Sequence, residues 1–227
     1  MTLIISVLAK DFALIASDKL AKATGSQNLI IDSIKVSIIA AKEITINGFK
    51  KIYLNKNATV AVAIAGDAHA HSYINKTSNI EDIDLVLSEI MTHTQNFNTI
   101  INRDINTLTD LTSNSGFAVF YDNSLSTFLS LYYDFSKISS TVKLWKSSDA
   151  AGFCYSGSGS PHIFQAKPEK EINAALAQVK DFSDVNKMIS LLSDIYNGVS
   201  ILNHSVSKDF EFFVATKENP FFHKLIA

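Results

Sequence analysis

Cysteine and arginine are nearly absent from this chain of 227 residues, and each scarcity excludes a class of protein. Cys154 is the only cysteine, which excludes an internal disulfide framework and a zinc site built from cysteines. Arg103 is the only arginine and the net charge is −2, whereas surfaces that bind nucleic acids normally present several arginine side chains. We therefore expect no nucleic-acid partner.

Long apolar runs, linkers and metal-ligand clusters are also lacking. No apolar run approaches the ~18 residues of a transmembrane helix, and the N-terminus lacks the basic flank of a signal peptide, so we expect a cytoplasmic protein with no membrane partner. Three prolines and eight glycines form no linker-like stretch, which predicts a single domain over residues 1–227. His69 and His71 are two residues apart and cannot share a helix face as metal ligands, so we expect no metal and no required cofactor.

Most of the sequence has the pattern of short strands rich in β-branched and aromatic residues. Val60–Ala65 and Phe12–Ala16 are continuously apolar, which predicts inner strands that are buried on both faces. The expected strands are 2–9, 12–17, 29–41, 43–47, 51–54, 59–65, 116–122, 126–134, 141–146, 152–155, 209–216 and 221–225.

Four helices are expected between these strands, at 68–75, 80–103, 169–179 and from the candidate N-cap Ser183 onward. The expected order of elements along the chain is strands, two helices, strands, two helices and strands. This order differs from the βαβ alternation of a parallel doubly wound fold. Two antiparallel sheets packed face to face, with a helix pair on each outer side, fit the order. We therefore expect an α+β protein with a four-layer αββα sandwich.

Thr2 directly follows Met1 and opens the first expected strand. Removal of Met1 would leave Thr2 with a free α-amine, whose unperturbed pKa of about 7.7–8.0 suits a general base near neutral pH. An N-terminal threonine thus carries a hydroxyl nucleophile and its base on one residue. If Met1 stays attached, the Thr2 nitrogen is an amide and cannot act as a base, so activity is conditional on Met1 removal.

Further polar motifs follow Thr2 at fixed intervals. Asp18 lies sixteen residues after Thr2, and Gly66 lies fifteen residues after Lys51, which ends a Phe-Lys-Lys motif. A Gly-Ser-Gly loop centred on Ser158 comes later, followed by an Asn-His pair that begins at Asn203. In this order the motifs resemble those of the proteasome-type N-terminal-nucleophile (Ntn) hydrolases, which include the proteasome β-subunits and the HslV-like threonine peptidases.

The resemblance covers most of the chain, and it implies the four-layer fold and a role for each motif. Thr2 would be the nucleophile and, through its own amine, the base. Lys51 would sit beside the threonine Oγ and favour its alkoxide character, and Asp18 would hold the Lys51 ammonium in place. The backbone N–H of Gly66, at a helix start, would donate to the oxyanion.

Supporting and substrate-binding roles also follow from the resemblance. Ser158 would position the Thr2 amine or a relay water, and Asn203 would have an auxiliary place near the end of the last helix. Ala21, Tyr53 and Ile64 would line a pocket that favours apolar side chains before the scissile bond.

The sequence departs from the family between Asp18 and Lys51. These residues are 33 apart, about twice the family's interval, which predicts an extended hairpin region at about 28–48 beside the substrate cleft. Lys35 is a competing lysine at nearly the ungapped distance from Thr2, but the residues after Lys51 match the family better.

Simpler structural interpretations remain open for the same residues. Asp18 and Lys51 could form an ordinary surface ion pair. Gly66 could merely ease the turn from a strand into a helix, and Ser158 could belong to a plain loop.

The leading hypothesis is a threonine endopeptidase subunit that acts on peptides or unfolded proteins. By resemblance it would form a homo-oligomeric ring with an inner chamber, fed by an ATP-dependent unfoldase. Charged residues are only 19% of the chain, below the usual ~25%. Subunit contacts that are buried in a ring would explain this low charge content. The alternatives are a catalytically inactive assembly subunit of the same fold and an Ntn amidase that acts on a small molecule.

Overall fold

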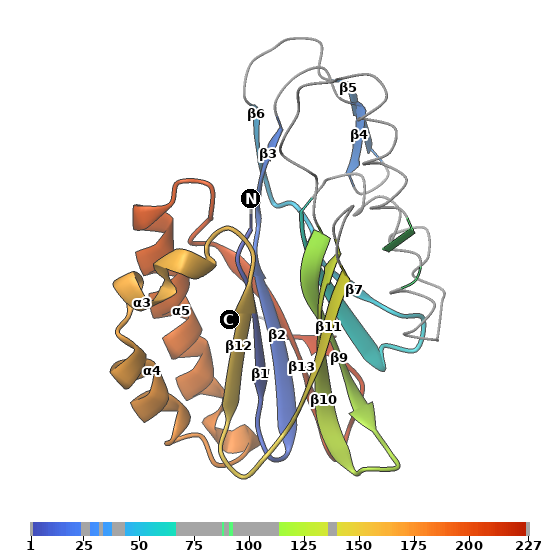
Figure 1. Ribbon diagram of the computed structural model, residues 1–227, viewed down its shortest axis with the longest axis vertical. Coiled ribbons are helices and arrows are strands. Elements are labelled where there is room, and N and C mark those ends of the chain that lie inside the picture. Colours follow the sequence, from blue (N-terminus) through green and yellow to red (C-terminus); the bar gives the residue numbers. More distant parts are fainter. Residues whose placement is uncertain are drawn as a thin grey trace.

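The computed structural model describes residues 2–23, 28–31, 34–37, 44–66, 88, 91–92, 114–135 and 140–225. Within these residues the protein has a mixed α+β fold, dominated by two five-stranded antiparallel sheets, with helices beside the first of them (Figure 1). The expected helix at 68–75 and most of the one at 80–103 lie outside the described residues. Ser88, Met91 and Thr92, from the second of these, are helical.

The first sheet has the strand order β12-β1-β2-β13-β14, and every pair in it is antiparallel. β1 and β2 are buried along their whole length, as the apolar run Phe12–Ala16 predicts. The strands are β1 (Ile4–Leu8), β2 (Phe12–Asp18), β12 (Gly152–Ser156), β13 (Phe210–Thr216) and β14 (His223–Lys224).

The second sheet has the order β11-β10-β9-β8-β7, again antiparallel throughout. Val60–Ala65 forms β8 and is buried at every position, which confirms the prediction of a strand covered on both faces. The other strands are β7 (Ile52–Leu54), β9 (Asn114–Asp122), β10 (Thr127–Phe135) and β11 (Ser140–Lys146).

Two small antiparallel pairs differ from the sequence prediction. Leu20–Ala23 (β3) was not expected to be a strand, and it pairs with β6 (Ile44–Asn47). In the expected strand 29–41, the described residues belong to two short strands, β4 (Asn28–Ile31) and β5 (Ile34–Ser37), which pair with each other. The extended region at 28–48 therefore contains the whole β4–β5 pair and the β6 half of the β3–β6 pair.

Three helices cover the outer face of the first sheet: α3 (Ile163–Ala166), α4 (Glu169–Leu176) and α5 (Val185–Leu202) (Figure 1). The short helix α3 was not predicted. Ser183 does not cap α5, contrary to expectation. Asp181 caps the single 3-10 turn that precedes α5, because its carboxylate accepts a hydrogen bond of 2.8 Å from the Ser183 amide.

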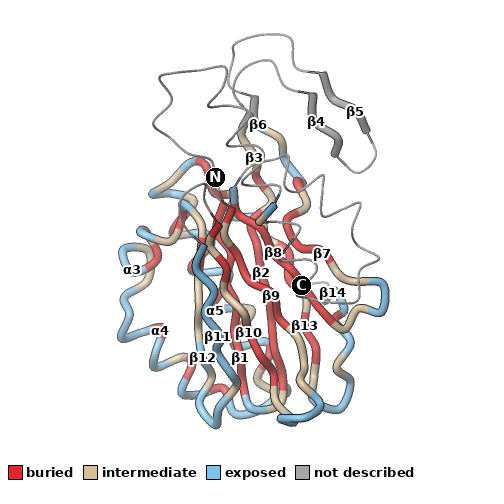
Figure 2. The backbone as a smooth tube through the Cα atoms, turned by 45° about the vertical axis from the view of Figure 1, so that its right-hand side comes forward, coloured by how far each residue is buried: buried red, intermediate tan, exposed pale blue. Residues whose placement is uncertain are grey.

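Buried residues run along the central strands of both sheets (Figure 2), and apolar clusters lie on both faces of each sheet. The largest joins α3, α4 and α5 to β1 and β2, and the second lies between the two sheets. The third covers the outer face of the second sheet, where the helical residue Met91 packs against it. The described elements are therefore stacked as helices, sheet and sheet.

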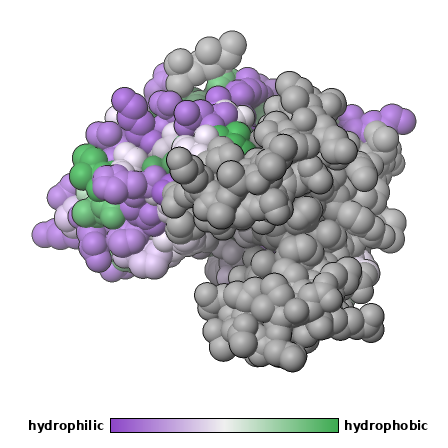
Figure 3. Space-filling view, turned by 90° about the horizontal axis from the view of Figure 1, so that it is seen from above, coloured by the Kyte–Doolittle hydropathy of each residue, from purple (hydrophilic) through white to green (hydrophobic). Residues whose placement is uncertain are grey.

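The surface over these helices is mostly hydrophilic when the molecule is seen from above, with a few hydrophobic side chains at its margin (Figure 3). Among the described residues, no helix combines the length and the apolar character needed to cross a membrane.

Candidate active site

The antiparallel topology brings four chain segments to one end of the two sheets. β1 begins where β2 ends, because Ile4 pairs with Ser17, and β7 begins where β8 ends, because Ile52 pairs with Ala63. Residues at these strand ends, or just beyond them, therefore lie close together. Thr2, Asp18, Lys51 and Gly66 all occupy such positions.

Thr2 is held through its main chain by the loop that follows β12. Its N–H donates a hydrogen bond of 3.0 Å to Ser158 Oγ, and its carbonyl oxygen accepts one of 3.1 Å from the Gly159 amide. Gly157 makes this approach possible, since a Cβ there would lie 2.3 Å from the Thr2 carbonyl oxygen. Only 3% of Thr2 is exposed, so the loop fixes a buried residue.

Lys51 and Asp18 form a buried ion pair. The Lys51 Nζ lies 2.8 Å from Asp18 Oδ1, and the two side chains are 1% and 0% exposed. The interpretation of these residues as an ordinary surface ion pair is therefore wrong. Lys35, the competing lysine, belongs to the separate β4–β5 pair.

The Asp18 carboxylate also connects this pair to the chain next to Thr2. Its Oδ1 accepts a hydrogen bond of 2.8 Å from the Leu3 amide, in addition to the one from Lys51. Its Oδ2 accepts one of 3.1 Å from the Leu20 amide. Because one carboxylate oxygen binds both the Lys51 ammonium and the Leu3 amide, the cation is held beside the residue that follows Thr2.

The environment of Lys51 acts on its protonation in two opposing ways. Burial lowers the pKa of the Lys51 ammonium, and the charge and hydrogen bond of Asp18, together with the charge of Glu211, oppose that shift. Burial prevails, so the pKa lies below its ordinary value. Lys51 is consequently a cation that gives up its proton more readily than a surface lysine does.

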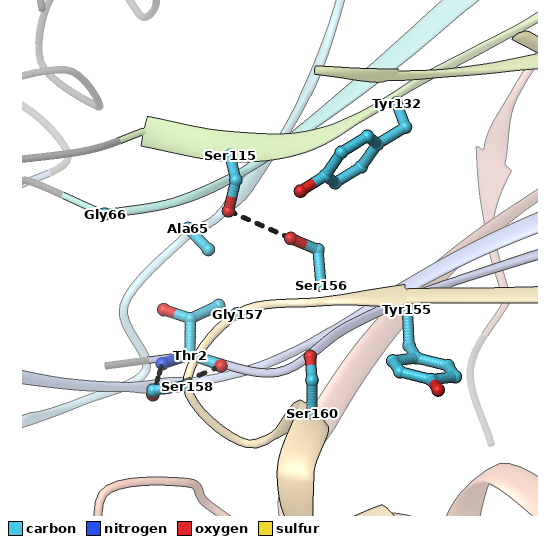
Figure 4. Close-up of a pocket in the computed structure, with 10 residues that line it drawn as sticks. All are labelled: Thr2, Ala65, Gly66, Ser115, Tyr132, Tyr155, Ser156, Gly157, Ser158 and Ser160. Carbon is cyan, nitrogen blue, oxygen red and sulfur yellow. Dashed lines mark hydrogen bonds between the residues drawn. The ribbon is translucent and has the colours of Figure 1, made fainter. Parts of the chain in front are cut away.

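A cavity of about 490 Å³ opens beside Thr2 (Figure 4). Thr2, Gly66 and Ser158 all line it, so the structure brings these three predicted site residues together. Gly66 has a φ of +140°, a conformation that favours glycine, so a structural reason for glycine exists here alongside the predicted role.

Asn203 lies immediately after α5 and supports the Ser158 loop. Its side-chain amide donates a hydrogen bond of 3.2 Å to the Ser158 carbonyl oxygen. Its Oδ1 accepts hydrogen bonds from the amide and the hydroxyl of Ser205. The auxiliary position predicted for Asn203 thus corresponds to a contact with the loop rather than with Thr2.

The three predicted substrate-binding residues do not line this cavity. Ile64 is fully buried, and it packs with Tyr53 in the cluster on the outer face of the second sheet. Ala21 lies in β3, where it pairs with Ile46. A role for these residues in substrate binding stays a prediction.

Other hydroxyl side chains that line the cavity carry no predicted role. Ser115 in β9 and Ser156 in β12 share a hydrogen bond of 2.9 Å that joins the two sheets, and Tyr132 in β10 lies next to them (Figure 4). Ser115 and Tyr132 lie on the paired strands β9 and β10, whereas Ser156 belongs to the other sheet. The packing of one sheet on the other brings Ser156 to them, so no local sequence pattern marks the group.

No protein-family model matches this chain, and no curated protein is similar to it in sequence. Within the described part of the chain, no group of three or more His, Cys, Asp or Glu side chains is arranged to hold a metal ion. His69 and His71 lie outside that part. The chemistry of the site is therefore argued from its geometry.

Proposed function

We propose that this protein is a threonine peptidase of the Ntn type, with the four-layer αββα fold of the proteasome family. The observation that carries the proposal is the position of Thr2. Its main-chain nitrogen is hydrogen-bonded to Ser158 Oγ at the edge of a cavity. The buried Lys51–Asp18 pair is hydrogen-bonded to the amide of the next residue, Leu3. Nucleophile, orienting hydroxyl and cation are thus close together.

The reaction begins after Met1 is removed, when the Thr2 nitrogen becomes an amine. This amine takes the proton from Thr2 Oγ as the oxygen attacks the carbonyl carbon of a peptide bond. The Lys51 charge favours the anionic character of Oγ, and the hydrogen bond with Ser158 orients the amine. The Gly66 amide donates to the oxyanion, an interaction worth roughly 3 kcal/mol of barrier in other hydrolases.

The tetrahedral intermediate then collapses to an ester. The Thr2 ammonium returns its proton to the peptide nitrogen, the C–N bond breaks and the amine product leaves. A water molecule, deprotonated by the same amine, attacks the ester carbonyl. Cleavage of the ester releases the carboxylic acid product and restores the Thr2 hydroxyl.

The proposal includes a homo-oligomeric ring that encloses the sites and receives unfolded protein from an ATP-dependent unfoldase. Exposed apolar side chains support extensive contacts between subunits: Val142 and Leu144 on β11 are 52% and 56% exposed, and Ile201 is 67% exposed. Sedimentation velocity of the purified protein measures this directly. A monomer at micromolar concentration contradicts the ring.

Thr2→Ala tests the nucleophile, in protein whose intact mass shows that Met1 has been removed. We expect the variant to lose all cleavage of an unfolded protein such as casein, while Thr141→Ala, an exposed threonine on β11, retains it. A threonine-directed epoxyketone should add to wild-type Thr2 and leave the Thr2→Ala variant unlabelled. Cleavage that is unchanged in Thr2→Ala refutes the mechanism, and processed wild-type protein that neither cleaves nor labels supports an inactive assembly subunit instead.

A further inference from the structure

The cavity beside Thr2 is lined by apolar surface together with hydroxyl groups, and its described lining residues carry no charge. Five of its residues outside the proposed catalytic set carry hydroxyls that the mechanism does not use, namely Ser115, Tyr132, Tyr155, Ser156 and Ser160. The Tyr155 hydroxyl points away from Ser115, Tyr132 and Ser156 (Figure 4). None of the described residues that line it is an aspartate, glutamate, lysine, arginine or histidine. The polar wall consequently offers hydrogen bonds but no counter-charge.

Several of these hydroxyls retain unused hydrogen-bonding capacity. A serine hydroxyl donates one hydrogen bond and accepts two, so the bond between Ser115 and Ser156 leaves one donor and further lone pairs for a ligand. Tyr132 donates to Asp134 Oδ2 at 3.3 Å and also interacts with the Ser156 hydroxyl, which leaves one lone pair on its oxygen for a ligand. Ser160 Oγ is buried and has no hydrogen-bond partner among the residues that the structure describes. The wall can therefore both donate and accept.

This lining disfavours two kinds of substrate side chain. A carboxylate or an ammonium group would lose its water without meeting a counter-charge on the lining residues, which is costly. Asp134 accepts a hydrogen bond from the Tyr132 hydroxyl, but it is not among those lining residues. An aliphatic side chain would displace water from the hydroxyls and leave them unpaired, which a site built for hydrogen bonding strongly rejects.

A carboxamide fits the same lining best. It presents a carbonyl acceptor and two N–H donors without a net charge, which matches a wall of hydroxyls that donate and accept. The volume of about 490 Å³ is ample for a glutamine side chain with part of the adjoining main chain. Figure 4 shows Ser115, Ser156 and Tyr132 gathered in one part of the cavity, across from Thr2 and Ser158.

We propose that the hydroxyl wall formed by Ser115, Tyr132, Ser156 and Ser160 is a specificity pocket that selects an uncharged hydrogen-bonding side chain, glutamine above all, next to the scissile bond. This inference rests on the proposed peptidase function. It differs from the apolar pocket that the family resemblance implies, because the cavity beside Thr2 is lined by hydroxyls and not by Tyr53 or Ile64.

Binding to the pocket can be measured without cleavage, because the chain reports on it through its single tryptophan. The Trp145 ring lies 6.1 Å from the Tyr132 ring in an edge-to-face contact. In the full-length Thr2→Ala variant, we expect a hexapeptide with a central glutamine to change Trp145 fluorescence saturably. Its Kd should be at least ~10-fold lower than for the same peptide with leucine, glutamate or lysine.

Two substitutions in the wall test which groups make the selection. Ser156→Ala removes one hydroxyl of the pair that joins the sheets, and Tyr132→Phe removes an acceptor without changing the shape of the ring. Each should reduce the preference for glutamine over leucine by about 5-fold or more. Ser148→Ala, an exposed serine away from this cavity, should leave the preference unchanged.

Cleavage by the Met1-processed wild type separates this inference from the proposed function. Peptides that carry glutamine, leucine, glutamate or lysine on either side of one bond are digested, and the cut bonds are mapped by mass spectrometry. Preferred cleavage beside glutamine supports the inference, and cleavage that is equal or faster beside leucine overturns it. If the glutamine peptide binds in the fluorescence assay but no peptide is cut, the pocket stands and the peptidase function fails.

Discussion

Replacement of Lys51 by methionine tests whether the buried ion pair stabilises the protein. Methionine keeps most of the length and the apolar stem of lysine, so the change removes the charge more than the volume. It leaves the Asp18 carboxylate, which is 0% exposed, without its cation. The amides of Leu3 and Leu20 still donate to that carboxylate, so it keeps part of its stabilisation.

The magnitude follows from the cost of stranding one buried charge. Removing one partner of a buried pair typically costs about 3–5 kcal/mol. With the Ser207 amide, which donates to Asp18 Oδ2 at 3.4 Å, three amide donors remain, and they place Lys51→Met toward the lower end of that range. For a chain of this size, such a loss lowers Tm by roughly 6–20 °C. The double variant with Asp18→Asn removes both charges and should cost less than the sum of the two single variants.

Thermal unfolding followed by circular dichroism at pH 7 measures these losses. Lys10→Met is the matched control, because Lys10 forms an ion pair with Asp149 at 3.1 Å while its side chain is 68% exposed. Exposed pairs contribute little, so this control should leave Tm nearly unchanged. If Lys51→Met lowers Tm no more than Lys10→Met does, the reasoning about the buried pair is wrong.

Three further predictions concern protonation and the Thr2 loop. Because the folded-state pKa of Lys51 lies below its ordinary value of 10.5, the unfolded chain binds more protons between these two values, so the Lys51 contribution to stability rises with pH there. The Tm difference between wild type and Lys51→Met should widen as the pH rises toward 10.5, and a narrowing would contradict this. Gly157→Ala should lower both Tm and peptidase activity, since its Cβ would meet the Thr2 carbonyl oxygen at 2.3 Å, whereas Gly152→Ala, whose nearest neighbour is 3.8 Å away, should leave activity intact. Burial raises the pKa of the Cys154 thiol to about 11, so iodoacetamide should label the folded protein at pH 8 far more slowly than the unfolded chain, and equal rates would refute this.

Apolar patterning predicted the central strands because burial on both faces leaves a local mark in the sequence. Phe12–Ala16 and Val60–Ala65 have no polar position, and both are buried throughout. The two small strand pairs, β3–β6 and β4–β5, were harder to predict. Leu20–Ala23 is a strand only because residues 44–47 pair with it, and a four-residue segment with one lysine has no period that reveals this.

The candidate site, too, could be predicted only in part from the sequence. The intervals between Thr2, Asp18, Lys51 and Gly66 identified residues that the structure places at one end of the sheets. The spacing did not determine that the Lys51–Asp18 pair is buried, because that depends on tertiary packing around both side chains. Nor did it indicate the hydroxyl wall, whose members come from three strands and from the 3-10 turn that begins at Ser160.

The anchoring of the N-terminal segment distinguishes a structural role for Thr2 from a chemical one. The Ser158 loop, the Asp18 carboxylate and the Tyr196 hydroxyl, which donates to the Leu3 carbonyl oxygen at 3.2 Å, all bind main-chain atoms of Thr2 or Leu3. Such anchors fix a residue in place before any substrate arrives, as a preorganised nucleophile requires. Because they act on the main chain, alanine at position 2 retains all of them, and any function lost in Thr2→Ala is attributable to the hydroxyl.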